Sequence, residues 1–197
     1  MRHDRRVAPF PGARAMDYWG VTCLILAPGI LLASWIDYSQ RRVPNWLNAS
    51  LIAAGFVVQG IYFGAEGLAA GLGGMLVGFG VLIVPWLMHG MGAGDVKLMS
   101  AIGVWLGPML TLYSFALGVI IGGVAAVVMI VSTRRLKHAC TNLNIILTKC
   151  TNPKLVFAEF GSAKSFGETS QLLPYGVPLT AGSLIMLAAR LFGWWGI

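Results

Sequence analysis

Residues 68–99, LAAGLGGMLVGFGVLIVPWLMHGMGAGDVKLM, join a long apolar run to a charged motif. The run at 68–88 has the length of about 20 residues that an α-helix needs to cross the hydrocarbon core of a membrane. Glycines then surround Asp95, which is one of only seven carboxylates in the chain. Because a charged side chain is costly at membrane depth, an acid directly after such a run indicates a functional site.

The rest of the chain has the composition of a membrane protein. Its 197 residues are 57% hydrophobic and 11% charged, whereas soluble domains carry about a quarter charged residues. We therefore predict an all-α polytopic membrane protein, a bundle of six transmembrane helices, and exclude a soluble globule. The predicted spans lie at about 18–36, 46–64, 68–88, 96–108, 109–131 and 174–193. Glycines spaced four apart, such as Gly74 and Gly78 or Gly118 and Gly122, indicate closely packed helices.

Positive charge predicts the orientation of these spans. Lys and Arg lie between spans one and two, at the start of span four and in a polar stretch at 132–173. Since cytoplasmic loops carry an excess of these residues, all three connections are expected in the cytoplasm, and 132–173 forms a cytoplasmic loop. The same rule accounts for the net charge of +7 without nucleic acid as a partner. Residues 17–197 are expected to form one transmembrane domain.

The N-terminal tail, residues 1–16, conflicts with this orientation, because its four Arg would lie outside the cytoplasm. We therefore hypothesise that Met16 is the biological start. N-terminal sequencing of the native protein tests this hypothesis, and a product beginning at Met1 would refute it.

Two acids are expected on the cytoplasmic side, where Asp37 ends span one and Asp95 opens span four. Span four extends only from Val96 to Pro108, which is about 20 Å of helix against a hydrocarbon core of about 30 Å. Asp95 is therefore expected below the membrane surface, in a water-filled cavity. The glycines before it allow the non-helical backbone that such a cavity tolerates.

Two carboxylates in different environments are what an aspartic protease requires, one ionised as a base and the other protonated as an acid. The N-terminus of a helix favours negative charge and its C-terminus does not. From this difference we predict Asp95 as the base and Asp37 as the acid. Two alternatives stay open at this point. In the first, the acids lie at the span ends near the lipid headgroups and pair with Lys97 and Arg41. In the second, they relay protons or cations in a small transporter or channel.

Three segments, in order, resemble the prepilin peptidase family of GxGD intramembrane aspartyl proteases. GAGDVKLM at 92–99 is similar to its GxGDxK motif. DYSQRRVPNWLN at 37–48 resembles its first-aspartate segment, and LPYGVPLTAG at 173–182 resembles the segment that opens its last span. GxGD alone is a weak signal, but the three segments together are specific and cover nearly the whole chain.

The resemblance implies that Asp37 and Asp95 are the catalytic pair of an aspartic-type endopeptidase. The implied substrate is a type IV prepilin-like protein, with a short basic leader and a cleavage site directly before an apolar helix. Cleavage is implied at the cytoplasmic face of the inner membrane, where lipid is the other partner. The residues that match the family motifs as supports are Gly92, Gly94, Lys97, Pro44 and Asn45.

The departures from the family pattern also carry predictions. Larger members have paired CxxC motifs for zinc and methylate the new N-terminus, whereas no CxxC pair occurs among Cys23, Cys140 and Cys150. The chain therefore resembles the short, peptidase-only branch of tight-adherence (Flp) pilus systems, without N-methyltransferase activity. Archaeal preflagellin peptidases share this short plan, so this group remains an alternative to the pilus peptidases. We expect no cofactor and no metal, because His89 is a lone candidate ligand and zinc sites need about three or four.

Two further features predict contacts with the membrane interface. The apolar run LNIIL at 143–147, flanked by His138 and Lys149, is expected either to lie in the interface or to remain a solvated loop. Tryptophans near the span ends are expected to act as interfacial anchors. They are Trp19, Trp35, Trp46, Trp86, Trp105, Trp194 and Trp195.

Overall fold

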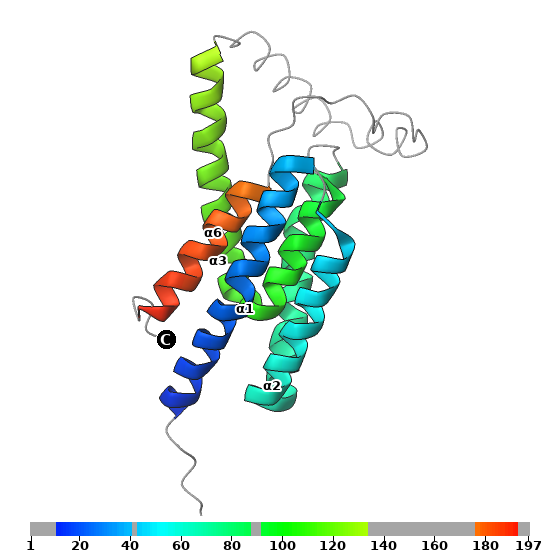
Figure 1. The fold of residues 1–197 in the computed structure, drawn as a ribbon, viewed down its shortest axis with the longest axis vertical. Coiled ribbons are helices and arrows are strands. Elements are labelled where there is room, and N and C mark those ends of the chain that lie inside the picture. The colour runs from blue at the N-terminus through cyan, green and yellow to red at the C-terminus, as the bar shows by residue number, and fades with distance from the viewer. Residues whose placement is uncertain (1–10, 41–42, 88–91, 134–175, 193–197) are drawn as a thin grey trace, which may run out of the picture.

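The computed structural model describes residues 11–40, 43–87, 92–133 and 176–192. These ranges contain helices and no strand, so the predicted all-α class is confirmed for them (Figure 1). The helices are α1 (Pro11–Gln40), α2 (Asn45–Leu87), α3 (Ala93–Thr133) and α6 (Gly176–Leu191). Three of them contain segments long and apolar enough to cross a membrane, namely Asp17–Gln40, Asn45–Leu87 and Ala93–Val128.

Helix α2 is a hairpin of two limbs that meet at Gly64. A continuous helix of its 43 residues would extend about 65 Å, twice the hydrocarbon thickness of about 30 Å. Gly64 instead has φ 61° and ψ −138°, a conformation open mainly to glycine. A Cβ atom added at Gly71 would lie 3.3 Å from the Phe56 ring, which requires the second limb to return along the first. Figure 1 shows these two limbs side by side.

Helix α3 is divided in the same way at Gly107, which has φ 72° and precedes Pro108. Its first limb packs on the second limb of α2, and its second limb packs on α6. The hydroxyl groups of Ser114 and Ser183 make the latter contact at 2.7 Å. Counting each limb, the described residues hold six helical segments, in the same order as the predicted spans.

Glycines allow the backbones of α2 and α3 to touch. A Cβ atom at Gly74 would overlap the carbonyl oxygen of Gly103, and one at Gly78 would overlap that of Met99. A Cβ atom at Gly118 would lie 3.2 Å from the backbone of Leu179 in α6. The prediction that spaced glycines serve helix packing is confirmed at these positions.

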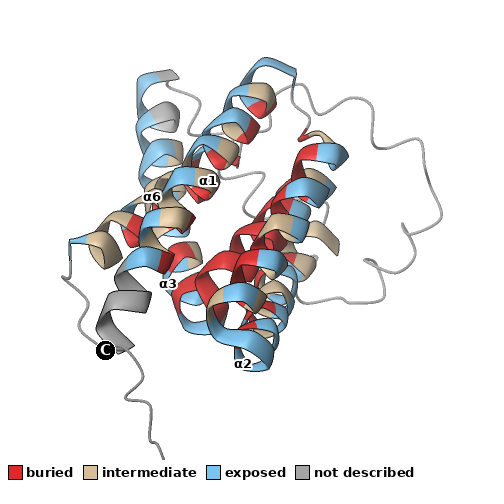
Figure 2. Cartoon of the chain, turned by 60° about the horizontal axis from the view of Figure 1, so that its bottom comes forward, coloured by how far each residue is buried: buried red, intermediate tan, exposed pale blue. Residues whose placement is uncertain are grey.

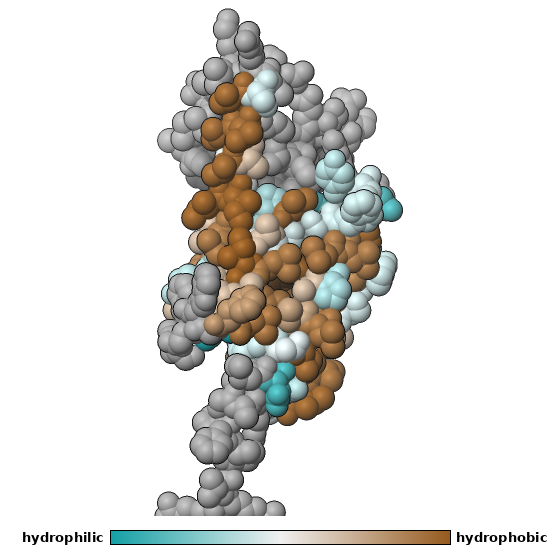
Figure 3. Space-filling model, turned by 60° about the vertical axis from the view of Figure 1, so that its left-hand side comes forward, coloured by the Kyte–Doolittle hydropathy of each residue, from teal (hydrophilic) through white to brown (hydrophobic). Residues whose placement is uncertain are grey.

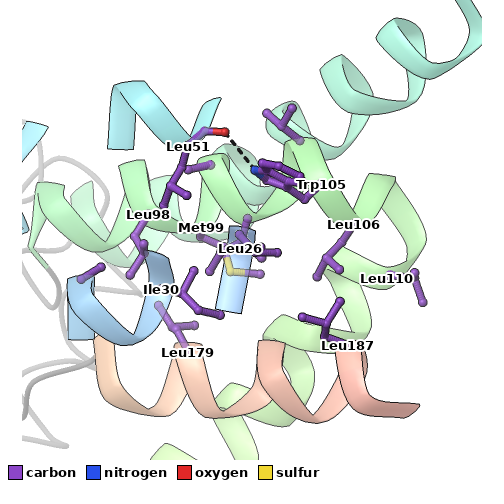
Figure 4. Close-up of a cluster of buried hydrophobic side chains, with 14 of the residues drawn as sticks. Leu26, Ile30, Leu51, Leu98, Met99, Trp105, Leu106, Leu110, Leu179 and Leu187 are labelled. Carbon is purple, nitrogen blue, oxygen red and sulfur yellow. Dashed lines mark hydrogen bonds between the residues drawn. The ribbon is translucent and has the colours of Figure 1, made fainter. Parts of the chain in front are cut away.

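The buried side chains form one cluster between the helices (Figure 2). It contains Leu26 and Ile30 of α1, Met99 and Trp105 of α3, and Leu187 of α6 (Figure 4). Many exposed side chains are also large and apolar, as on lipid-facing helices, and Figure 3 shows them gathered on one face of the molecule. On the second limb of α3 the exposed side chains include Val119, Ile120, Val124, Val127, Val128 and Val131.

The prediction of an interfacial anchor is wrong for one tryptophan, Trp105. Trp105 is fully buried, and its indole N–H donates to the carbonyl oxygen of Leu51 at 2.9 Å. The ring fits because Gly55, facing it on α2, has no side chain, and because α3 turns back at Gly107 inside the bundle. Trp35 and Trp46 are 70% and 64% exposed, as anchors would be.

Several predicted boundaries differ from the observed ones or cannot be compared. Helix α1 begins at Pro11, so helix extends into the predicted tail 1–16. Helix α3 continues to Thr133, at the start of the predicted loop 132–173. The remainder of that loop, including the run at 143–147, lies outside the described residues, as does His89.

Candidate active site

Asp37 lies in the last turn of α1 and is only 8% exposed. Its carboxylate accepts a hydrogen bond from the backbone N–H of Gly176, the first residue of α6. The approach is close: a Cβ atom at Gly176 would lie 2.7 Å from Asp37 Oδ2. The N-terminus of a helix has free N–H groups and positive potential, so α6 provides a matching environment for a carboxylate.

Gly176 belongs to the third of the sequence segments noted above, but it is not among the predicted site residues. The available signal was a glycine between two prolines, Pro174 and Pro178, at the start of an apolar span. Its partner Asp37 is 139 positions earlier in the chain, so nothing local in the sequence links the two residues.

Asp95 lies in the first turn of α3, as predicted, and is 6% exposed. Its backbone N–H donates to the Gly92 carbonyl oxygen at 3.2 Å. Its carboxylate in turn accepts from the backbone N–H of Gly92. A Cβ atom at Gly92 would make only an ordinary contact with Asp95 Oδ2, at 3.6 Å. The motif glycine therefore holds the second acid through its backbone.

The two acids come together from different helices, near enough for their charges to interact. Lys97, a proposed partner in the capping alternative, instead donates from Nζ to Asn45 Oδ1 at 2.8 Å. Arg41, the other proposed partner, lies outside the described residues. Within the described part of the chain, neither carboxylate pairs with a cation.

The segments that carry the supporting residues also pack on each other. A Cβ atom at Gly94 would lie 3.2 Å from Val43 Cβ, directly before Pro44 and Asn45. The Pro44 carbonyl oxygen accepts the backbone N–H of Asn48 at 3.3 Å, which closes the first turn of α2. All seven predicted site residues therefore lie at one end of the bundle, where α1 ends and α2, α3 and α6 begin (Figure 1).

The described residues contain no group of three or more His, Cys, Asp or Glu side chains that would hold a metal ion. Two carboxylates are also fewer ligands than zinc normally takes, which is about four. The arrangement suits acid–base chemistry, because two buried acids from different helices lie near enough for their charges to interact.

Comparison with known proteins assigns the family. The sequence model of the type IV leader peptidase family matches residues 24–127, just over half of the chain, and this range includes both acids. A prepilin leader peptidase/N-methyltransferase of Stutzerimonas stutzeri is 33% identical over 112 residues, 51% of this chain and 38% of the relative. The protein of the same name from Aeromonas salmonicida (strain A449) is 30% identical over 119 residues, 53% and 40% of the two chains.

A type 4 prepilin-like proteins leader peptide-processing enzyme of Escherichia coli O78:H11 is 27% identical over 98 residues, 46% of this chain and 36% of the relative. The alignments thus cover well under two thirds of the length of each relative. No solved structure matches the chain. The family match confirms the resemblance inferred from the three sequence segments: this chain belongs to the type IV leader peptidase family.

Proposed function

We propose that the chain is an intramembrane aspartyl endopeptidase that cleaves the leader peptide of type IV prepilin-like proteins. Asp37 and Asp95 are the catalytic pair. The observation that carries the proposal is the meeting of these two buried carboxylates from separate helices, each bonded to a glycine N–H and neither to a cation among the described residues. The names of the relatives supply the substrate class.

In the proposed reaction, one acid of the pair takes a proton from water as the water oxygen attacks the scissile carbonyl carbon, and the other gives its proton to the carbonyl oxygen. The resulting tetrahedral diol then collapses. The first acid returns the proton to the leaving nitrogen as the C–N bond breaks, and the second acid recovers its proton from the diol. The pair shares one proton in its resting state, because two close carboxylates repel each other when both are charged. Both acids lie at a helix N-terminus, Asp95 at α3 and Asp37 at α6, so the helix ends do not support the predicted assignment of Asp95 as the base and Asp37 as the acid.

The remaining residues of the site hold these acids in place. Gly92 presents its N–H to Asp95. The hydrogen bond from Lys97 to Asn45 joins the start of α3 to the start of α2. Pro44 and Gly94 shape the same junction, since residues 43–45 lie against Gly94. A misplacement of about 1 Å at an active site can cost about 100-fold in rate, so such supports affect catalysis without touching the substrate.

The proposed setting is the inner membrane, crossed by all six helical segments. Length and apolar composition support this setting. In the sequence, Arg41 and Arg42 follow Asp37 between the first two spans and Lys97 follows Asp95, and such an excess of positive charge favours the cytoplasmic side. The basic leader of a prepilin would then meet the acids from the cytoplasm while its apolar helix remains in the membrane.

We further propose that cleavage occurs without N-methylation. The chain has three cysteines and no CxxC pair, and α2 begins soon after α1 ends. Mass spectrometry of the processed product tests this point: an unmodified new N-terminus is expected, and a gain of one methyl group would contradict it.

A cleavage assay tests the peptidase proposal. A prepilin-like protein is co-expressed with the wild type, with Asp37→Asn, with Asp95→Asn, and with Asp17→Asn as the control. Asp17 is an exposed acid of α1, two thirds of the helix away from Asp37. We expect the wild type and Asp17→Asn to remove the leader, and each of the other two variants to leave it intact.

Continued cleavage by both Asp37→Asn and Asp95→Asn would reject the catalytic pair. If the wild type cleaves none of several prepilin-like proteins, the result would favour the second candidate function, a proton or cation relay. Buried acids at membrane depth are also suited to that function. Proton flux into vesicles that contain the purified protein would then be the measurement.

A further inference from the structure

Asn48 is a buried side chain whose amide has no partner. It lies on the first limb of α2 and is 2% exposed. Both Nδ2 and Oδ1 are buried and lack a hydrogen bond within the described part of the chain. A buried amide normally finds a partner, because leaving its donors and acceptor unpaired is energetically costly. Gln59, the other buried amide of this limb, does so: its Nε2 donates to the Val104 carbonyl oxygen at 3.0 Å.

The face of α2 that carries Asn48 points to the helices that carry the acids. Three residues before it, Asn45 bonds to Lys97 of α3. Three residues after it, Leu51 packs on α1, where a Cβ atom at Gly29 would lie 2.6 Å from its Cδ2 atom. Residues three apart share a face of a helix, so Asn48 lies between these two contacts, toward the seam of α1 and α3.

The depth of Asn48 follows from the same register. The first limbs of α2 and α3 run in parallel, because Asn45 meets Lys97 and Gly55 meets Trp105. Asn48 is three residues beyond Asn45, or about 4.5 Å along the helix axis. It therefore lies about one helical turn below the acids, on the side of the apolar core.

That level is where the membrane-embedded side of a bound substrate would lie. A peptide bond must leave the helix to be hydrolysed, and the first four N–H groups of the apolar helix that follows then have no partner. At membrane depth each unpaired group is costly, so the enzyme must supply partners. A carboxamide offers two donors and an acceptor, and Asn is a favoured residue at a helix start.

We propose that the Asn48 amide binds the main chain of the substrate directly after the scissile bond. The inference rests on the proposed peptidase function and adds a substrate-binding residue to it. Asp37 and Asp95 are themselves 8% and 6% exposed. A substrate that reaches them must open the same seam, and that opening also uncovers Asn48.

The test replaces Asn48 by leucine, which has a similar shape and no polar atoms. Because an unpaired amide is removed, the midpoint of thermal unfolding is expected to rise, by roughly 2–4 °C. The kcat/KM for a prepilin-like protein is expected to fall about ten-fold, as the hydrogen bonds to the substrate are lost. Gln59→Leu is the control: it loses a bond within the fold, so its midpoint falls while its kcat/KM stays within about two-fold of wild type.

Unchanged kcat/KM in Asn48→Leu would overturn the proposal, whatever the melting temperature. A lower melting temperature would also overturn it, because the amide would then have a partner in the free protein, such as a buried water. Asp37→Asn is measured beside it. If that variant still cleaves, the proposed function itself has failed, and this failure is distinct from that of the Asn48 proposal.

Discussion

Replacing Gly176 by alanine would place a methyl carbon 2.7 Å from Asp37 Oδ2. Ordinary contacts of a Cβ atom begin near 3.4 Å, so the carboxylate and the start of α6 must separate by about 0.7 Å. The same shift lengthens the hydrogen bond from the Gly176 N–H to Asp37. Since a displacement of about 1 Å can cost about 100-fold in rate, kcat is expected to fall by about 10- to 100-fold.

The assay is a time course of leader removal by the purified enzyme at saturating prepilin-like substrate, with a thermal melt to confirm that the variant is folded. Gly123→Ala is the matched control, because a Cβ atom at that helical glycine meets nothing within 4 Å. It is expected to keep the wild-type kcat. A folded Gly176→Ala that also keeps the wild-type kcat would refute the reasoning, since Asp37 would then not depend on α6 for its position.

Two other contacts give predictions of their own. Lys97→Met and Asn45→Leu each remove the 2.8 Å bond that joins α3 to α2, so each should lower kcat/KM several-fold. The double variant should lose little more than either single one in a double-mutant cycle, and fully additive losses would contradict a shared role. Trp105→Phe removes the buried hydrogen bond of the indole N–H and should lower the free energy of unfolding by about 1 kcal/mol. Chemical denaturation measures this loss. Trp35→Phe, at an exposed position, should leave stability unchanged, and equal losses in both variants would count against the role of the bond.

Much of the fold was readable from local patterns. Apolar runs predicted the helical segments because the length needed to cross a hydrocarbon core is a property of the run itself. Asp95 stood out because a charge beside such a run is costly, and its glycines predicted the unusual backbone before α3. The spaced glycines predicted the close packing of helices for the same local reason.

Other features depend on contacts between distant segments. Gly64 and Gly107 reverse the chain inside α2 and α3, and these reversals decide which faces meet. Trp105 was expected at the interface because it lies near a span end, yet the turn at Gly107 places that end inside the bundle.

The sequence thus contained the helices, the two acids and the motif glycines, because each is marked by the composition and order of its own neighbours. The tertiary structure alone brought the N–H of Gly176 to Asp37, tied Lys97 to Asn45 and left the amide of Asn48 unpaired. These features depend on the distance between atoms of different helices, which is set by the way the helices pack and not by the spacing of residues along any one of them.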